Sequence, residues 1–149
     1  MTKFIVFFTF LFLYTSLYAS GPFTLTNLEC ANISLKNKTQ IFNEQDEENI
    51  IELLTEAVQE TKIKVNQEDC PSFRITLRAI DAKPNYYLHV KLDLREDVIT
   101  DRKDNIRTFA LTYSASDFTQ SQEIHSDVLD SVQRLVDDLV KHFNDDNEK

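Results

Sequence analysis

Glycine and tryptophan are scarce in this sequence. The chain of 149 residues contains one glycine, Gly21, and no tryptophan. Phosphate-binding loops, the dinucleotide-binding fingerprint and the G-x-S-x-G turn of many hydrolases each need two or more glycines. Calcium loops of the EF-hand type also need a glycine at their sharp turn. The glycine content therefore excludes these classes, and we expect no cofactor.

Positive charge is also in short supply. Acidic residues number 25 and basic residues 16, which gives a formal charge of −9. A protein this negative is disfavoured at the phosphate backbone of nucleic acids and at anionic membranes. We therefore expect no nucleic-acid partner. Apolar residues make up 42% of the chain, which suffices for a folded core, and the length fits one domain.

The one long apolar run lies at the amino terminus. Lys3 is followed by an apolar run over residues 4–14, and Ala19 precedes Ser20. A short basic start, an apolar segment and a small residue before a cleavage point are typical of a secretory signal peptide. The run is shorter than the roughly 20 residues of a membrane span. We predict a signal peptide over 1–19, and a mature domain over 20–149 that is periplasmic or secreted and has no membrane span.

The two cysteines agree with export. Cys30 and Cys70 are the only ones in the chain, and no C-x-x-C motif or neighbouring histidine points to redox or metal chemistry. An even cysteine count in an exported protein predicts a disulfide. A bridge that closes a loop of this length stabilises a domain by about 4 kcal/mol in the chain-entropy model.

Two segments have the apolar spacing of amphipathic helices. The first is predicted over 44–61, with Asn43 as its cap and Asp46 in its first turn. The second is predicted over 120–143, with Thr119 and Gln122 at the spacing of a capping box and a polar tail after it.

Alternating apolar and polar residues predict strands elsewhere. A turn is expected at 36–38, and a charged connection over 96–105. The predicted strands cover 23–35 (as one or two short strands), 63–65, 73–79, 86–95 and 107–114.

The predicted order is therefore strand, helix, three strands, helix. A sheet with one polar face must cover its other face. We predict an α+β two-layer sandwich, in which two helices cover one face of an antiparallel sheet of about four strands.

The uncovered sheet face is the candidate contact surface. Tyr87 is expected there, near Arg74 or Arg78 on the strand before it and near Arg107 or Phe109 on the strand after it. Arginine beside exposed aromatic side chains is a common interface composition. The candidate surface consists of Arg74, Arg78, Tyr87, His89, Lys91 and Arg107.

No motif for catalysis or metal binding stands out. The histidines His89, His125 and His142 do not have metal-ligand spacing, and we expect them to be solvated. We expect neither a metal site nor an enzyme. Asn32 and Asn37 match the N-glycosylation acceptor pattern, which has force only in a eukaryotic secretory pathway; in a bacterial protein they are plain loop residues.

Three functions fit these features. The first is a non-enzymatic accessory module of the cell envelope that binds another protein or assists assembly. The second is a carrier of small apolar ligands, which would need an apolar pocket of at least about 300 Å³. The third is a secreted effector or inhibitor that acts on another protein. An enzyme whose site no local motif encodes is a further alternative, which carboxylates with strongly shifted pKa values in a cleft would favour. The sequence leaves the oligomeric state open.

Overall fold

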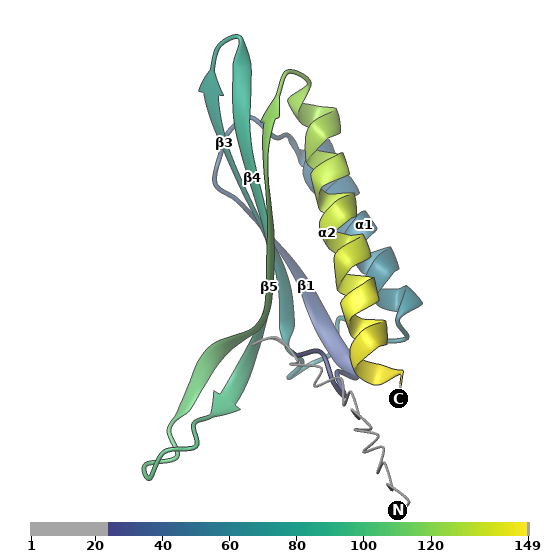
Figure 1. Ribbon diagram of the computed structural model, residues 1–149, viewed down its shortest axis with the longest axis vertical. Helices are drawn as coiled ribbons and strands as arrows, with labels where there is room; N and C mark the ends of the chain where they lie inside the picture. Colours follow the sequence, from purple (N-terminus) through teal and green to yellow (C-terminus); the bar gives the residue numbers. More distant parts are fainter. Residues whose placement is uncertain (1–23, 149) are drawn as a thin grey trace, which may run out of the picture.

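The computed structural model describes residues 24–148, so the predicted signal peptide over 1–19 and the start of the predicted strand at 23 lie outside it. Five strands form one sheet in the order β2-β1-β3-β4-β5, and two helices lie together on one side of it (Figure 1). The elements are β1 (Cys30–Asn37), α1 (Glu44–Glu60), β2 (Lys64–Val65), β3 (Ser72–Ala82), β4 (Asn85–Ile99), β5 (Arg107–Ser121) and α2 (Ile124–Asn147). The predicted α+β two-layer sandwich is confirmed.

The sheet is mixed, which corrects the prediction of a wholly antiparallel sheet. Strands β3, β4 and β5 form the expected antiparallel meander, but β1 pairs in parallel with both β2 and β3. The cause is the helix between β1 and β2. A helix that returns along one face of the sheet brings the next strand back in the direction of the previous one.

The core lies between the sheet and the two helices. Alternate residues of β3 and β4 point toward the helices and are almost fully buried, among them Phe73, Leu77 and Leu92. The helices add Leu54 and Val132, each with none of its surface exposed. Burial of side chains of this size is worth about 1.5–3 kcal/mol each, so this layer holds the helices on the sheet.

The first helix begins where the sequence predicts. The Asn43 side chain accepts a hydrogen bond from the Asp46 backbone N–H at 3.0 Å, and the Asn43 N–H donates to the Asp46 carboxylate at 2.9 Å. This reciprocal pair satisfies two of the otherwise unpaired donors at the helix start.

The second helix begins and ends about four residues later than predicted. Strand β5 continues to Ser121, so Thr119 lies in the strand, and the residue that precedes the helix is Glu123, without a side-chain cap. The expected capping box at Thr119 and Gln122 is therefore wrong. Residues 119–121 are too few for their apolar and polar pattern to show whether they end a strand or begin a helix.

Three other predicted boundaries also shift. Residues 24–29 form a turn and extended chain in place of a strand, β1 runs into the expected turn at 36–38 as far as Asn37, and β4 extends to Ile99 in the predicted connection over 96–105. The last difference creates a projecting hairpin, residues 96–110, which we call the arm (Figure 1).

The shortage of glycine affects the turns. Five non-glycine residues adopt positive φ, namely Asn27, Lys62, Asn66, Asp69 and Asn105. Asparagine and aspartate tolerate this left-handed conformation better than other residues with a Cβ. Lys62, directly after the last turn of α1, has φ 66° where glycine is the usual residue.

Candidate functional site

The sheet face that the helices leave uncovered is the candidate site, and we call it the open face. Side chains alternate along each strand, so the residues between the buried ones of β3 and β4 point away from the helices. Strand register places the neighbours: Arg78 lies opposite His89, and Arg74 opposite Asp93. Arg74, Arg78, Tyr87, His89, Lys91 and Arg107 all lie on the open face.

The neighbours of Tyr87 differ from those expected. Its cross-strand partners are Ile80 on β3 and Gln120 on β5. Arg107 lies far along β5 in the arm, opposite Ile99. The expected proximity of Tyr87 to Arg107 or Phe109 is wrong because β5 continues beyond 114, so its last third, not its first, reaches Tyr87.

Apolar side chains are exposed at both ends of the open face. Near the β3–β4 turn, Ile80 and Tyr87 are joined by Phe118, which is 70% exposed and whose ring centroid lies 6.0 Å from that of His89. At the arm, Phe109 is 78% exposed. Sequence reasoning missed Phe118 because its segment was assigned to a connection before the helix. Exposed aromatic groups on one face are typical of an interaction surface.

Positive charge gathers on this same face. Six Lys and Arg side chains stand against two carboxylates, a formal charge of +4. These residues are Lys36, Arg74, Arg78, Lys91, Arg95, Arg107, Asp93 and Asp97. Lys36 and Arg95 were not among the predicted contact residues, although both lie on the polar side of an alternating pattern.

The helices have the opposite charge. Helix α1 contains seven acidic residues and no Lys or Arg, and α2 contains six acidic residues with Arg134 and Lys141. Their formal charges are −7 and −4. The two layers of the sandwich therefore differ strongly in charge, and the net charge of the chain hides the basic character of the open face.

The pKa of Lys38, at the edge of the open face, is lowered by the positive charges near it. The charge of Arg78 is the largest cause that lowers the pKa of Lys38 below its ordinary value; burial, Lys36 and Arg95 lower it further. Lys38 is exposed. Nearby cations therefore act on it through solvent.

Part of this positive charge is used within the sheet. The Asp93 carboxylate, only 2% exposed, contacts Lys91 Nζ at 2.7 Å and Arg95 Nη2 at 3.7 Å, and accepts a hydrogen bond from Ser114 at 2.8 Å. Arg107 pairs with Asp97 at 2.6 Å. These contacts hold the centre of the face and the arm in place.

The remaining cations are available to a partner. Among residues 24–148, no carboxylate lies within 4.0 Å of the charged groups of Lys36, Arg74 or Arg78. Arg74 Nε makes one long contact to Ser34 Oγ at 3.5 Å. A guanidinium without a carboxylate keeps its fork of donors for bidentate recognition of an acidic group.

A groove of about 730 Å³ lies on the open face beside the arm. Arg74, Arg95 and Arg107 line it together with Phe109 and Leu111, and the chain around Cys70 closes one side. Arg95 Nε is buried there and has no hydrogen-bond partner. Asp69, Glu96 and Asp97 also line the groove. The groove thus combines three arginines and three carboxylates with exposed apolar surface, and one buried arginine donor in it has no partner.

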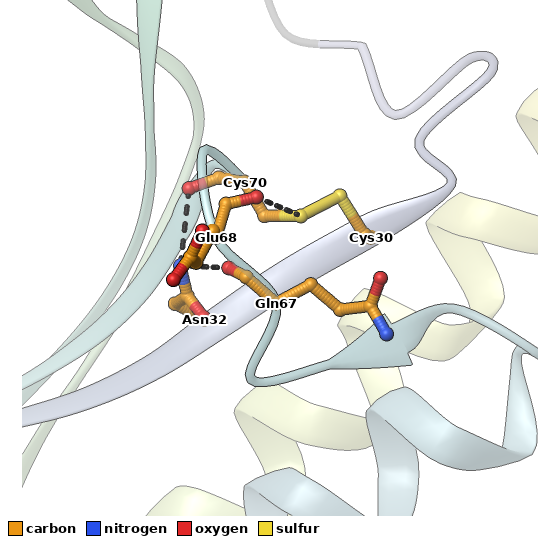
Figure 2. The surroundings of a disulfide bond; sticks show 5 residues. All are labelled: Cys30, Asn32, Gln67, Glu68 and Cys70. Carbon is orange, nitrogen blue, oxygen red and sulfur yellow. Dashed lines mark hydrogen bonds between the residues drawn. A yellow bond between two sulfur atoms is a disulfide. The ribbon is translucent and has the colours of Figure 1, made fainter.

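The disulfide builds the wall of this groove. Cys30 and Cys70 are bonded, as predicted, with their Cα atoms 5.7 Å apart. Figure 2 shows Asn32 beside them, where its side-chain amide donates to the backbone carbonyls of Gln67 (3.0 Å) and Cys70 (3.3 Å). The Asn37 amide donates to the Glu47 carboxylate at 2.8 Å. Both asparagines lie on β1, not in a loop, and their amides hold the structure together.

The histidines are at least partly exposed, as expected, and they also have partners within the fold. His125 Nδ1 lies 2.8 Å from the Asp46 carboxylate, and the His142 ring packs against Tyr113. Within the described residues, no group of three or more His, Cys, Asp or Glu side chains is placed to hold a metal ion. Neither of the two helices is long and apolar enough to cross a membrane, as far as residues 24–148 show.

No protein family and no curated protein matches this chain. Among solved structures it is similar to a minor lipoprotein from Acinetobacter baumannii, with 10% identity and a TM-score of 0.38 over 74% of this chain and 89% of that chain. PelC from Paraburkholderia phytofirmans, described as a dodecamer, gives 10% identity and 0.46 over 76% and 87%. The rare lipoprotein B from Shewanella oneidensis gives 11% and 0.38 over 74% and 91%. With TM-scores below 0.5, these similarities support no conclusion about function.

Proposed function

We propose that this protein is an exported, non-enzymatic binding module whose open face docks an acidic surface of a partner protein. One observation carries the proposal: Arg74 and Arg78, which have no ion-pair partner in the described part of the chain, lie on the same face as the exposed rings of Phe109 and Phe118. Arginine and aromatic side chains are the residues most often found at the energetic centre of protein interfaces.

A protein partner is favoured over a nucleic acid or an anionic membrane. The two carboxylates Asp93 and Asp97 interrupt the cations of the open face, so it lacks an uninterrupted basic stripe for a phosphate backbone. The helix layer adds long-range repulsion toward any extended anionic surface. A compact acidic patch on a protein avoids that repulsion.

Export is part of the proposal. The predicted signal peptide over 1–19 and the disulfide Cys30–Cys70 support a periplasmic or secreted location, because disulfides persist in oxidising compartments. A secreted effector or inhibitor would use the same open face. The apolar-ligand carrier is less favoured, because the groove beside the arm (about 730 Å³) and the groove between the helices (about 620 Å³) lie outside the helix–sheet layer and are lined by charged residues.

Photo-cross-linking in the producing cells tests this function. A photoreactive phenylalanine derivative replaces Phe118 or Tyr87 on the open face, and Gln67 in the exposed loop after β2 as a control. We expect one dominant protein product from the open-face positions and none from position 67. Equal labelling at all three positions, or no product at Phe118 and Tyr87, would contradict the proposal.

A charge reversal identifies the chemistry of the contact. Lys36→Glu/Arg78→Glu removes two exposed open-face cations without breaking an ion pair of the described structure. Lys62→Glu/Lys64→Glu changes the net charge by the same amount away from the open face. The first variant should lose the cross-linked product and the second should retain it. Loss in both would show a response to net charge, not to this face.

A further inference from the structure

The helix layer contains a second groove, whose character complements the open face. It lies between α1 and α2 and has a volume of about 620 Å³. Its apolar residues are the half-buried Leu53 and Val140 and the buried Ala57 and Val136, and its charged residues are Glu56, Glu60, Asp137, Asp145 and Lys141. An acidic surface with apolar residues is thus part of the protein itself.

We infer that the open face of one copy binds the helix layer of a second copy, in a head-to-tail arrangement. This inference rests on the proposed function, and it names the acidic partner of the open face. The cations of the open face meet the acidic residues of α1 and α2, and the exposed aromatic groups of the sheet meet Leu53 and Val140, the half-buried apolar residues of the groove. Within each copy, two helices pack on one face of the sheet. In the proposed contact, the helices of the second copy pack on the other face.

Charge excludes the alternative ways in which two copies could pair. Two open faces would bring formal charges of +4 together, and two helix layers would bring −11 together. Like charges across an interface cost several kcal/mol. A symmetric dimer through either face is therefore disfavoured. Opposite faces give a heterologous contact, which closes into a ring or continues as a filament.

The size of the open face suits such a contact. Four strands about 4.8 Å apart, over the eleven residues of β3, give an area of about 700 Å². A standard interface buries about 800 Å² on each partner. Figure 1 also shows the arm bending away from the helices, which makes the open face concave at that end. A concave surface fits the convex surface of a helix pair.

Two variants test the arrangement, and each alters the charge of one of the two faces. Lys36→Glu/Arg78→Glu lowers the formal charge of the open face from +4 to 0, and Glu56→Lys/Glu60→Lys reduces that of the helix layer from −11 to −7. All four side chains are exposed, and lysine near the carboxyl end of α1 favours the helix. Lys62→Glu/Lys64→Glu is the charge-matched control for the first variant, and circular dichroism verifies folding of each.

Sedimentation velocity of the purified mature protein at low ionic strength gives the readout. We expect the wild type and the control to associate, and each face variant alone to bind at least about 100-fold more weakly, because like charges then meet at the two substituted positions and the attraction between the faces is reduced. A 1:1 mixture of the two face variants should form a discrete dimer, since one intact open face and one intact helix layer remain. Added salt should weaken association.

Three results would overturn the inference: a monomeric wild type, face variants that still self-associate, or a mixture that stays monomeric while the wild type assembles. These outcomes are separable from the proposed function. If the wild type is monomeric but Phe118 cross-links a different protein in cells, the inference fails and the proposed function stands. If neither assembly nor cross-linking occurs, both fail.

Discussion

The disulfide offers the sharpest test of how this small domain is held together. Cys30 and Cys70 are 40 residues apart in sequence, and the loop that they close contains all of α1 and β2. The chain-entropy model gives about 13 cal/mol/K for a loop of this length, or about 4 kcal/mol at room temperature. Over about 130 residues, each contributing about 2.1 cal/mol/K, this corresponds to a fall in Tm of about 15 °C.

The measurement compares Cys30→Ala/Cys70→Ala with the oxidised wild type by urea denaturation and far-UV circular dichroism. Reduced and alkylated wild type is the control, because it lacks the bond but retains both cysteine residues. Both should lose about 4 kcal/mol in the free energy of unfolding. A loss below about 1 kcal/mol in both would refute the reasoning, since the unconstrained loop would then cost almost nothing to close.

Three further predictions concern single side chains. Lys62→Gly should raise the free energy of unfolding by about 1 kcal/mol because glycine relieves the positive φ at that position, whereas Lys62→Ala should not; thermal denaturation distinguishes them. Burial of Asp117 acts to raise its pKa, but hydrogen bonds from Arg134 and Ser131 outweigh it and lower the pKa below its ordinary value. Asp117→Asn should therefore lose up to about 1 kcal/mol near neutral pH, and its difference from the wild type should vanish in urea titrations as the pH falls below about 4 through the lowered pKa. Burial, helped by the charge of Asp138, raises the pKa of Tyr113 to about 12. Stability should then be complete below pH 10 and decline between about 10 and 12, while Tyr113→Phe, followed by circular dichroism at alkaline pH, should lack that decline.

Total charge proved a poor guide to what a surface of this protein can bind. The sum of −9 predicts an acidic molecule throughout, yet the acidic residues gather on the helices and leave the open face basic. Binding depends on the local field, because exposed charges are screened over about 10 Å at moderate salt. Asp93 and Asp97 within the open face therefore disfavour nucleic-acid binding as much as the net charge does.

Local patterns determined much of this protein. The spacing of Ile50, Leu54 and Val58 predicted α1 because a helix has one apolar stripe, and Asn43 with Asp46 predicted its start. Strict alternation over 86–95 predicted β4 and the face on which Tyr87 and the cations lie. The pairing of the two cysteines followed from their number alone. Each of these features depends on neighbours in sequence, so the sequence carries them directly.

Only the tertiary structure decided which distant residues meet. The parallel pairing of β1 with β3 follows from the path of the chain across the sheet, which no local pattern records. The same holds for the neighbours of Tyr87, since they depend on how far β5 runs before α2 begins. The groove beside Cys70 and the separation of charge between the two layers arise when strands far apart in sequence align. Register and topology are set by long-range packing, and for this reason the open face could be predicted as a list of residues but not as a surface.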